Sequence, residues 1–155
     1  MKKYTPIAKK TAQQLVKVAD EAFSKYVRLR DSDHIGDSWV GTCITCSKNG
    51  TVAWLDDGKL RFVSGWDAGH FIQRGAKITR FDEENVNLQC AFHCNKMKSG
   101  NLEKYKPALD IKYGEGTWRK LSETAQANQY YKFNKPQLLE IIHDAKEAIA
   151  FMEEK

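Results

Sequence analysis

Apolar residues recur at a helical spacing near both ends of the chain. Across residues 8–30 they return every three or four positions, at Leu15, Val18, Ala19, Ala22, Phe23, Tyr26 and Val27. Residues 136–152 show the same pattern behind Pro136, which suits the first turn of a helix, and their apolar stripe comprises Leu138, Leu139, Ile142, Ala145, Ile149 and Met152. This period is typical of amphipathic helices, so the sequence predicts a helix near each end.

The middle of the chain carries shorter signals. Residues 52–55 and 60–63 flank Asp56-Asp57-Gly58, a turn sequence that predicts a β-hairpin. Residues 31–42 are rich in Asp, Ser and Gly and are expected to form a loop, and a short extended piece is expected near residues 70–72. Together with the helices, these signals favour a small α+β domain.

Two further helices are expected beyond this central region. Ser99-Gly100-Asn101 predicts a chain break with an N-cap, followed by a helix over residues 102–113. Pro107 lies inside that helix and predicts either a kink or a late start. Residues 117–131 are expected to hold a short helix.

The charge of the chain is modest and unevenly distributed. Its 155 residues include 25 Lys and Arg and 20 Asp and Glu, which gives a net charge of +5. The excess lies in residues 1–36, with 8 basic and 4 acidic side chains, and in residues 71–106, with 7 and 4. A nucleic acid is the natural partner of such stripes, although charge alone fits a well-solvated surface equally well.

Neither a membrane span nor a secretory leader is predicted. No apolar run approaches the roughly 18 residues that a transmembrane helix needs. The N-terminal Met-Lys-Lys-Tyr-Thr-Pro has no apolar core behind its lysines. We therefore expect a cytoplasmic protein without a membrane partner.

Four cysteines form two close pairs separated by a long insert. Cys43-Ile-Thr-Cys46 has the C-x2-C spacing, and Cys90-Ala-Phe-His-Cys94 has the C-x3-C spacing. In a reducing compartment such pairs predict one tetrahedral structural zinc more than a disulfide, and the context of a thioredoxin-like redox pair is absent. His93 lies inside the second pair and is the alternative to Cys90, but a histidine beside a ligand is more often a bystander. The expected zinc ligands are therefore Cys43, Cys46, Cys90 and Cys94.

Polar residues with a distinctive order surround the second pair. His70 lies between the two pairs in Trp66-Asp67-Ala68-Gly69-His70, Asn85 precedes the second pair, and Asn95 directly follows it. This order resembles the HNH, or ββα-metal, nuclease motif. The resemblance implies that His70 is the general base, that Asn95 binds a catalytic magnesium or manganese ion, and that Asn85 orients the imidazole.

Longer strings carry a more specific resemblance. They are Tyr26-Val-Arg-Leu-Arg-Asp31, Ala68-Gly-His-Phe-Ile72, Arg80-Phe-Asp-Glu83, Asn85-Val86, Gln89-Cys90, Cys94-Asn95, Ser99-Gly-Asn101, Ala108-Leu-Asp110 and Lys112-Tyr-Gly-Glu-Gly116. In this order and spacing, which covers roughly residues 20–121, the chain resembles the bacteriophage NinG (Rap) recombination-protein family. The resemblance implies a metal-dependent nuclease that cuts Holliday junctions and D-loops in the host cytoplasm.

The sequence departs from these patterns at two places. The second cysteine pair has one residue more than the family's usual C-x2-C, which keeps Cys90 and His93 as alternatives. Typical HNH nucleases place a metal-binding Asp or His directly before the base, where this chain has Gly69. Asp67 is the nearest carboxylate, but strand positions 67 and 70 face opposite sides, so Asp67 reaches the metal only through a bulge or turn.

Basic residues cluster around these positions. They are expected to contact DNA phosphates without reading bases, and they are Arg74, Lys77, Arg80, Lys96 and Lys98. Such contacts fit an enzyme that selects DNA structure over sequence.

The sequence thus predicts one α+β domain over residues 1–155. Its parts are a basic N-terminal helix (1–36), a zinc-braced HNH-like core (37–115) and a C-terminal helical extension (116–155). The expected activity is endonuclease cleavage of branched DNA. The alternatives are a non-catalytic zinc module that binds DNA and recruits recombination proteins, and an HNH nuclease for other DNA or RNA. A resolvase makes two cuts, so the apolar stripes of the end helices serve either a homodimer or packing within one chain.

Overall fold

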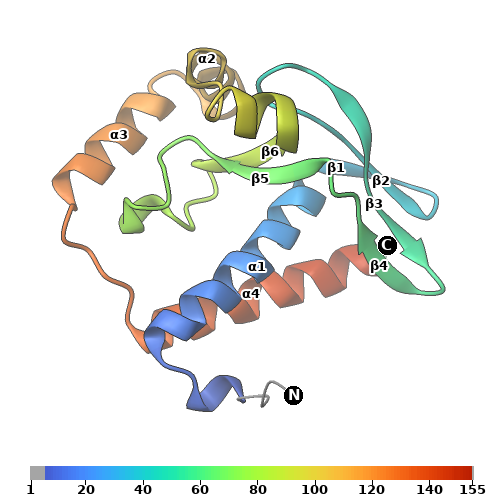
Figure 1. The fold of residues 1–155 in the computed structure, drawn as a ribbon, viewed down its shortest axis with the longest axis horizontal. Helices are drawn as coiled ribbons and strands as arrows, with labels where there is room; N and C mark the ends of the chain where they lie inside the picture. Colours follow the sequence, from blue (N-terminus) through green and yellow to red (C-terminus); the bar gives the residue numbers. More distant parts are fainter. Residues whose placement is uncertain (1–5, 155) are drawn as a thin grey trace.

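The computed structural model describes residues 6–154 of the chain (Figure 1). Its helical elements are η1 (Ile7–Lys9), α1 (Ala12–Arg30), η2 (Lys77–Thr79), η3 (Ala91–Met97), α2 (Leu102–Tyr113), α3 (Thr117–Ala127) and α4 (Lys135–Glu153). Its strands are β1 (Ser32–Ile35), β2 (Ser38–Thr42), β3 (Asn49–Asp56), β4 (Lys59–Phe62), β5 (Trp66–His70) and β6 (Val86–Cys90). The predicted mixture of helices and antiparallel sheets in an α+β fold is confirmed.

The two end helices, α1 and α4, lie side by side (Figure 1). Each begins with a capping box, in which Thr11 pairs with Gln14 and Asn134 with Gln137. Their predicted apolar stripes pack against each other, through contacts that include Leu15, Ala19, Leu138 and Ile142. These stripes are therefore covered within one chain, and a homodimer stays a prediction.

Strands β1 to β4 form an antiparallel sheet in sequence order. The predicted hairpin is confirmed as β3–β4, whose Asp57-Gly58 turn has positive φ at both residues, as a type I′ turn requires. The loop expected over residues 31–42 is wrong, because these residues form the β1–β2 hairpin. Its turn begins with Gly36 at φ +61°, and the buried Trp39 stacks on His34 with ring centroids 4.1 Å apart.

Strands β5 and β6 form a separate antiparallel pair that contacts α1. In Figure 1 this pair lies between α1 on one side and α2 on the other. The extended piece expected near residues 70–72 lies earlier, because β5 ends at His70. Beyond it, the Asn85 side chain accepts from the Ile72 amide and donates to the Ile72 carbonyl, which satisfies both backbone groups without a further strand.

The helices after β6 match the predicted positions with local differences. Helix α2 spans the expected residues and carries Pro107 without a late start, and α3 ends at Ala127, before the predicted residue 131. Asn101 lies at the N-cap of α2, but its φ is +53° and its side chain makes no capping bond. The side-chain nitrogen Nδ2 of Asn101 instead donates to Cys94 Sγ over 3.5 Å. Among the described residues no helix is long and apolar enough to cross a membrane.

Candidate metal and catalytic site

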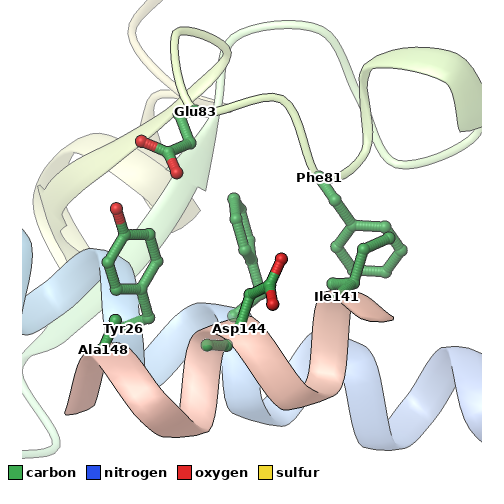
Figure 2. A pocket seen from close by; sticks show the side chains of 8 residues that line it. Tyr26, Phe81, Glu83, Ile141, Asp144 and Ala148 are labelled. Atoms are coloured by element: carbon green, nitrogen blue, oxygen red, sulfur yellow. The ribbon is translucent and has the colours of Figure 1, made fainter. Parts of the chain in front are cut away.

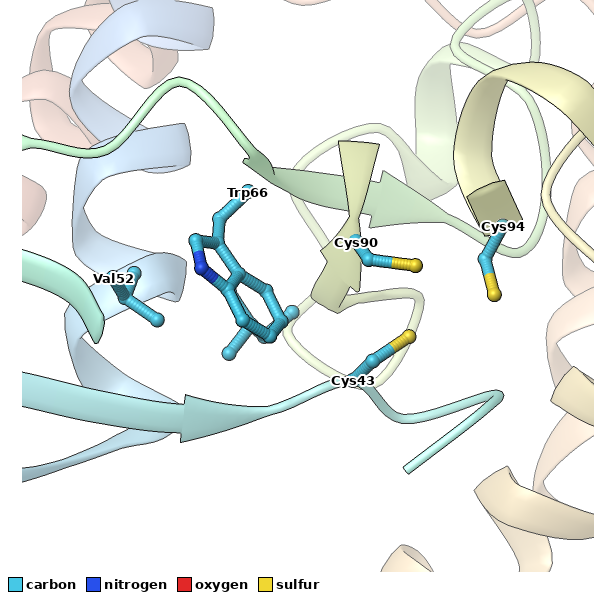
Figure 3. Close-up of a cluster of buried hydrophobic side chains, with 6 residues drawn as sticks. Cys43, Val52, Trp66, Cys90 and Cys94 are labelled. Carbon is cyan, nitrogen blue, oxygen red and sulfur yellow. The ribbon is translucent and has the colours of Figure 1, made fainter. Parts of the chain in front are cut away.

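The four cysteines converge at one place in the fold. Figure 3 shows the three buried ones, Cys43, Cys90 and Cys94. The sulfur atoms of all four cysteines lie within 4.8 Å of one another, and Cys46 Sγ and Cys90 Sγ are 3.7 Å apart. Four thiolates at about 2.3 Å from one tetrahedral zinc are separated by about 3.8 Å. The cluster therefore has the composition and the size that a structural zinc site requires.

The geometry separates the two candidates for the fourth ligand. Cys90 lies at the end of β6, is buried, and belongs to the cluster. His93 is exposed and lies outside the set of mutually close ligand atoms, although its Nδ1 is 3.6 Å from Cys94 Sγ. The extra residue in the second pair thus leaves both of its cysteines in the cluster.

Apolar and polar neighbours support the cluster in different ways. Trp66 and Val52 pack against the buried cysteines and exclude water from one side (Figure 3). Although burial opposes the thiolate, hydrogen bonds from Thr45 and from backbone amides lower the pKa of Cys43 to about 6. Burial raises the pKa of Cys90 to about 12.

His70 ends β5 and is held in one orientation by a backbone carbonyl. Its Nε2 lies 2.9 Å from the carbonyl oxygen of Arg80. Because a carbonyl only accepts, Nε2 carries the proton of the neutral ring and Nδ1 carries the free lone pair. Burial lowers the pKa of His70, and the positive charges of Arg74 and Arg80 lower it further. The imidazole is therefore neutral at physiological pH, with Nδ1 available as a base.

Asp67 and Asn95 form a hydrogen-bonded pair in the hollow that His70 also lines. Asn95 Nδ2 donates to Asp67 Oδ2 over 2.9 Å, and both residues line the same hollow of about 140 Å³ as His70. The bulge expected for this arrangement is absent, since β5 and β6 pair without interruption from Trp66 to His70. One carboxylate and one amide oxygen are the donor types that magnesium and manganese prefer, so the residues fit a hard divalent ion.

The residue before His70 has a steric reason to be glycine. A Cβ on Gly69 would lie 2.0 Å from Gln89 Oε1, because the buried Gln89 side chain covers this position. Gln89 Nε2 donates to Thr45 Oγ1 and to the Gly100 carbonyl, which links the first cysteine turn to the turn that precedes α2. A metal-binding side chain at position 69 is therefore incompatible with this packing.

Asn85 is buried and does not touch the imidazole in the structure. Its side chain bonds the backbone of Ile72 and donates to the Thr79 carbonyl over 2.9 Å. These bonds fix the loop whose next residue, Arg80, holds His70. The predicted orienting role of Asn85 can therefore act only through this loop.

The predicted DNA-contacting residues fall into two groups. Arg74, Lys77, Lys96 and Lys98 are exposed, and Arg74 lines the His70 hollow. Arg80 is instead paired with Asp20 of α1, with Nε 2.8 Å from Oδ1, and its Nη1 donates to the Arg74 carbonyl. Sequence reasoning missed Asp20, because nothing in the spacing connects residues 60 positions apart.

A second hollow beside the site is acidic. It measures about 330 Å³ and lies between α1, α4 and the segment around Phe81, with the carboxylates of Glu83 and Asp144 among its lining groups (Figure 2). Phe23 and Phe81 line both hollows and pack edge to face. Two carboxylates without a lining cation make this hollow unfavourable for phosphate.

Two antiparallel sheets, a four-cysteine cluster and a polar hollow at the end of β5 define an α+β protein with a candidate metal centre. The family model described as Bacteriophage Lambda NinG protein matches residues 2–154. The chain therefore belongs to the bacteriophage NinG family.

Curated relatives agree with this assignment. The chain is 34% identical over 113 residues to Protein ninG of Salmonella phage P22, and 32% identical over 114 residues to Protein ninG of Escherichia phage lambda. The alignments cover 72% and 73% of this chain, and 46% of each relative. The chain thus spans about half the length of the curated relatives it matches. No solved structure gave a significant match.

Proposed function

We propose that this protein is a metal-dependent, structure-selective DNA endonuclease that acts on branched recombination intermediates, such as Holliday junctions and D-loops. One observation carries the proposal. A neutral, oriented histidine lies in the same hollow as a carboxylate–amide pair that suits a divalent ion. This combination supplies the base and the oxygen ligands that phosphodiester hydrolysis needs.

The reaction assigned to this hollow is hydrolysis by water. Nδ1 of His70 accepts a proton from the attacking water, whose oxygen forms the new bond to phosphorus as the bond to the leaving oxygen breaks. Asp67 and Asn95 would hold magnesium or manganese, which neutralises charge on the phosphate and the leaving oxygen when bound. The Arg80 carbonyl keeps the imidazole in the tautomer that this role requires.

The cysteine cluster is assigned a structural role. Cys43, Cys46, Cys90 and Cys94 would hold one zinc with a closed shell, which leaves no position for water or substrate. Cys90 ends β6 and Cys94 immediately precedes Asn95, so a metal there would fix the helical segment that presents Asn95.

The substrate class rests on charge and on the resemblance to the recombination family. Arg74 lines two hollows with His70 and Asn95, and Lys96 and Lys98 follow Asn95 directly. These cations favour phosphates without offering a base-reading pattern, which fits selection by DNA shape. Branched intermediates are the substrate that the family resemblance implies.

Cleavage of labelled four-way junction, D-loop, flap, duplex and single-stranded DNA with Mg²⁺ or Mn²⁺ tests the proposal. His70→Ala should abolish cleavage while junction affinity and zinc content stay unchanged. His143→Ala is the matched control, because His143 is exposed on α4 and lies outside the hollow. Equal cleavage by His70→Ala and wild type would refute the proposal. Junction binding by wild type without any cleavage would establish a non-catalytic DNA-binding module instead.

A further inference from the structure

A strongly basic hollow lies next to the candidate catalytic site. It measures about 520 Å³ and is formed by α1, by η2 and by the segment between α3 and α4. Its cations are Lys17, Lys77, Arg80 and Lys132, and none of its lining residues is acidic. Three separate parts of the chain thus contribute positive charge to one concave surface.

Three of these cations have no carboxylate partner. Lys17, Lys77 and Lys132 are exposed, and within residues 6–154 none of them forms an ion pair or a side-chain hydrogen bond. Other lysines are paired, as Lys25 is with Glu21 and Lys112 with Asp31. Because these ammonium groups are unpaired and surround one hollow, they are free to bind an anionic ligand.

The floor of this hollow is apolar and well supported. Val16 and Phe133 contribute apolar surface, and the Phe133 ring packs on Phe81 with centroids 5.2 Å apart and on Tyr131 at 5.0 Å. The aliphatic stems of lysines can lie along such a surface while their ammonium groups reach a ligand. These apolar side chains carry no charge, so they do not neutralise the cations of the hollow.

The basic hollow adjoins the His70 hollow, because Arg80 lines both. Along α1, Lys17 lines the basic hollow, and Asp20 and Ser24 line the His70 hollow. Three to seven residues of α-helix span about 5–10 Å. At about 3.4 Å per base pair along the duplex axis, this distance corresponds to about one to three base pairs.

We propose that this basic hollow binds the phosphate backbone of a DNA arm, about one to three base pairs from the phosphate at His70. The inference rests on the proposed function for the position of the cut, and it adds Lys17 and Lys132 to the DNA-contacting residues. A second backbone contact further along the same face of α1 gives the protein a way to sense the direction of an arm.

The test compares two double variants of the full chain that remove the same charge. Lys17→Gln/Lys132→Gln alters the hollow, whereas Lys59→Gln/Lys146→Gln alters exposed lysines outside it. Affinity for a labelled four-way junction is measured by fluorescence anisotropy between 50 and 200 mM salt, without added divalent metal. The hollow variant should bind at least tenfold more weakly, and its salt slope should fall by about 2, since each lost phosphate contact removes about 0.9.

The outcomes separate the inference from the proposed function. Equal weakening in both double variants would show a general charge effect and overturn the inference. Unchanged affinity and slope in the hollow variant would overturn it as well. If His70→Ala did not reduce cleavage, the proposed nuclease function would be refuted. The binding comparison of the two double variants would still decide whether the basic hollow binds DNA.

Discussion

The contact between Gly69 and Gln89 gives the sharpest prediction about stability. In Gly69→Ala the new methyl group would lie 2.0 Å from Gln89 Oε1 and 2.7 Å from Gln89 Cδ. Gln89 is fully buried and makes two hydrogen bonds, to Thr45 and to Gly100, so its side chain cannot move without losing them. The substitution therefore forces either a steric clash or the loss of buried hydrogen bonds.

The expected size follows from two opposing effects. Overpacking of this kind costs about 1–3 kcal/mol, whereas replacing glycine by alanine in a strand recovers about 0.5–1 kcal/mol of backbone entropy. Because the new contact would be as short as 2.0 Å, the upper end of the overpacking cost applies. The net loss in the free energy of unfolding should then be about 2 kcal/mol, or about thirtyfold in the unfolding constant. For a chain of this size the melting temperature should fall by roughly 5 °C.

Urea unfolding at a fixed zinc concentration measures this loss. Gly65→Ala is the matched control, because a Cβ there meets nothing within 4 Å, and it should change stability by less than about 0.5 kcal/mol. In a Gln89→Ala background, Gly69→Ala should be nearly neutral, which gives a coupling energy of about 2 kcal/mol. Additive effects of the two substitutions, or a Gly69→Ala variant as stable as Gly65→Ala, would refute the reasoning.

Three further predictions address the metal, the base and the buried charges. Cys46→Ser should lower zinc content below one per chain by metal analysis and shift the urea midpoint down, whereas an unchanged midpoint would argue against a structural zinc. The acid limb of kcat/KM for junction cleavage should lie below pH 6.5, because burial lowers the pKa of His70, and a limb at or above 6.5 would contradict this. Asp31→Asn should cost about 3–5 kcal/mol in urea unfolding, since it removes the buried carboxylate that Arg30 and Lys112 share. Although burial alone raises the pKa of Asp31, these two cations hold it below 3.8, so wild type should lose this stabilisation as the pH falls below about 4, and the variant should not.

Periodic and local signals led to correct elements. The stripes that begin with Leu15 and Leu138 predicted α1 and α4. A helix that buries one face has apolar residues every three or four positions, and this spacing is visible in the sequence. Asp57-Gly58 predicted its hairpin, because the positive φ of both turn residues is a local requirement. The β1–β2 hairpin was missed, since its strands are rich in Asp, Ser and Gly, and Trp39 stabilises them by burial in the tertiary structure.

The candidate site likewise combines residues that the sequence indicated with contacts that only the fold reveals. The spacing of the cysteines and of His70 and Asn95 indicated the residues, because ligand and base chemistry depends on residue type. The sequence favoured Cys90 over His93 as the fourth ligand, but the extra residue in the second pair kept His93 as an alternative. The fold places Cys90 in the cluster. The sequence also could not identify the Arg80 carbonyl as the partner of His70, because every residue has a backbone carbonyl. This carbonyl is positioned by the loop, which the Asp20–Arg80 pair and Asn85 hold in place.

The sequence by itself determined the end helices, the four-cysteine set and the family to which the chain belongs. Only the tertiary structure brought Asp67 to Asn95, decided the tautomer of His70, and gathered Lys17, Lys77 and Lys132 around one hollow. The physical reason is the range of the interactions. Helix periods, turns and ligand spacings act over a few residues, whereas these contacts join residues 10 to more than 100 positions apart and exist only when the chain is packed.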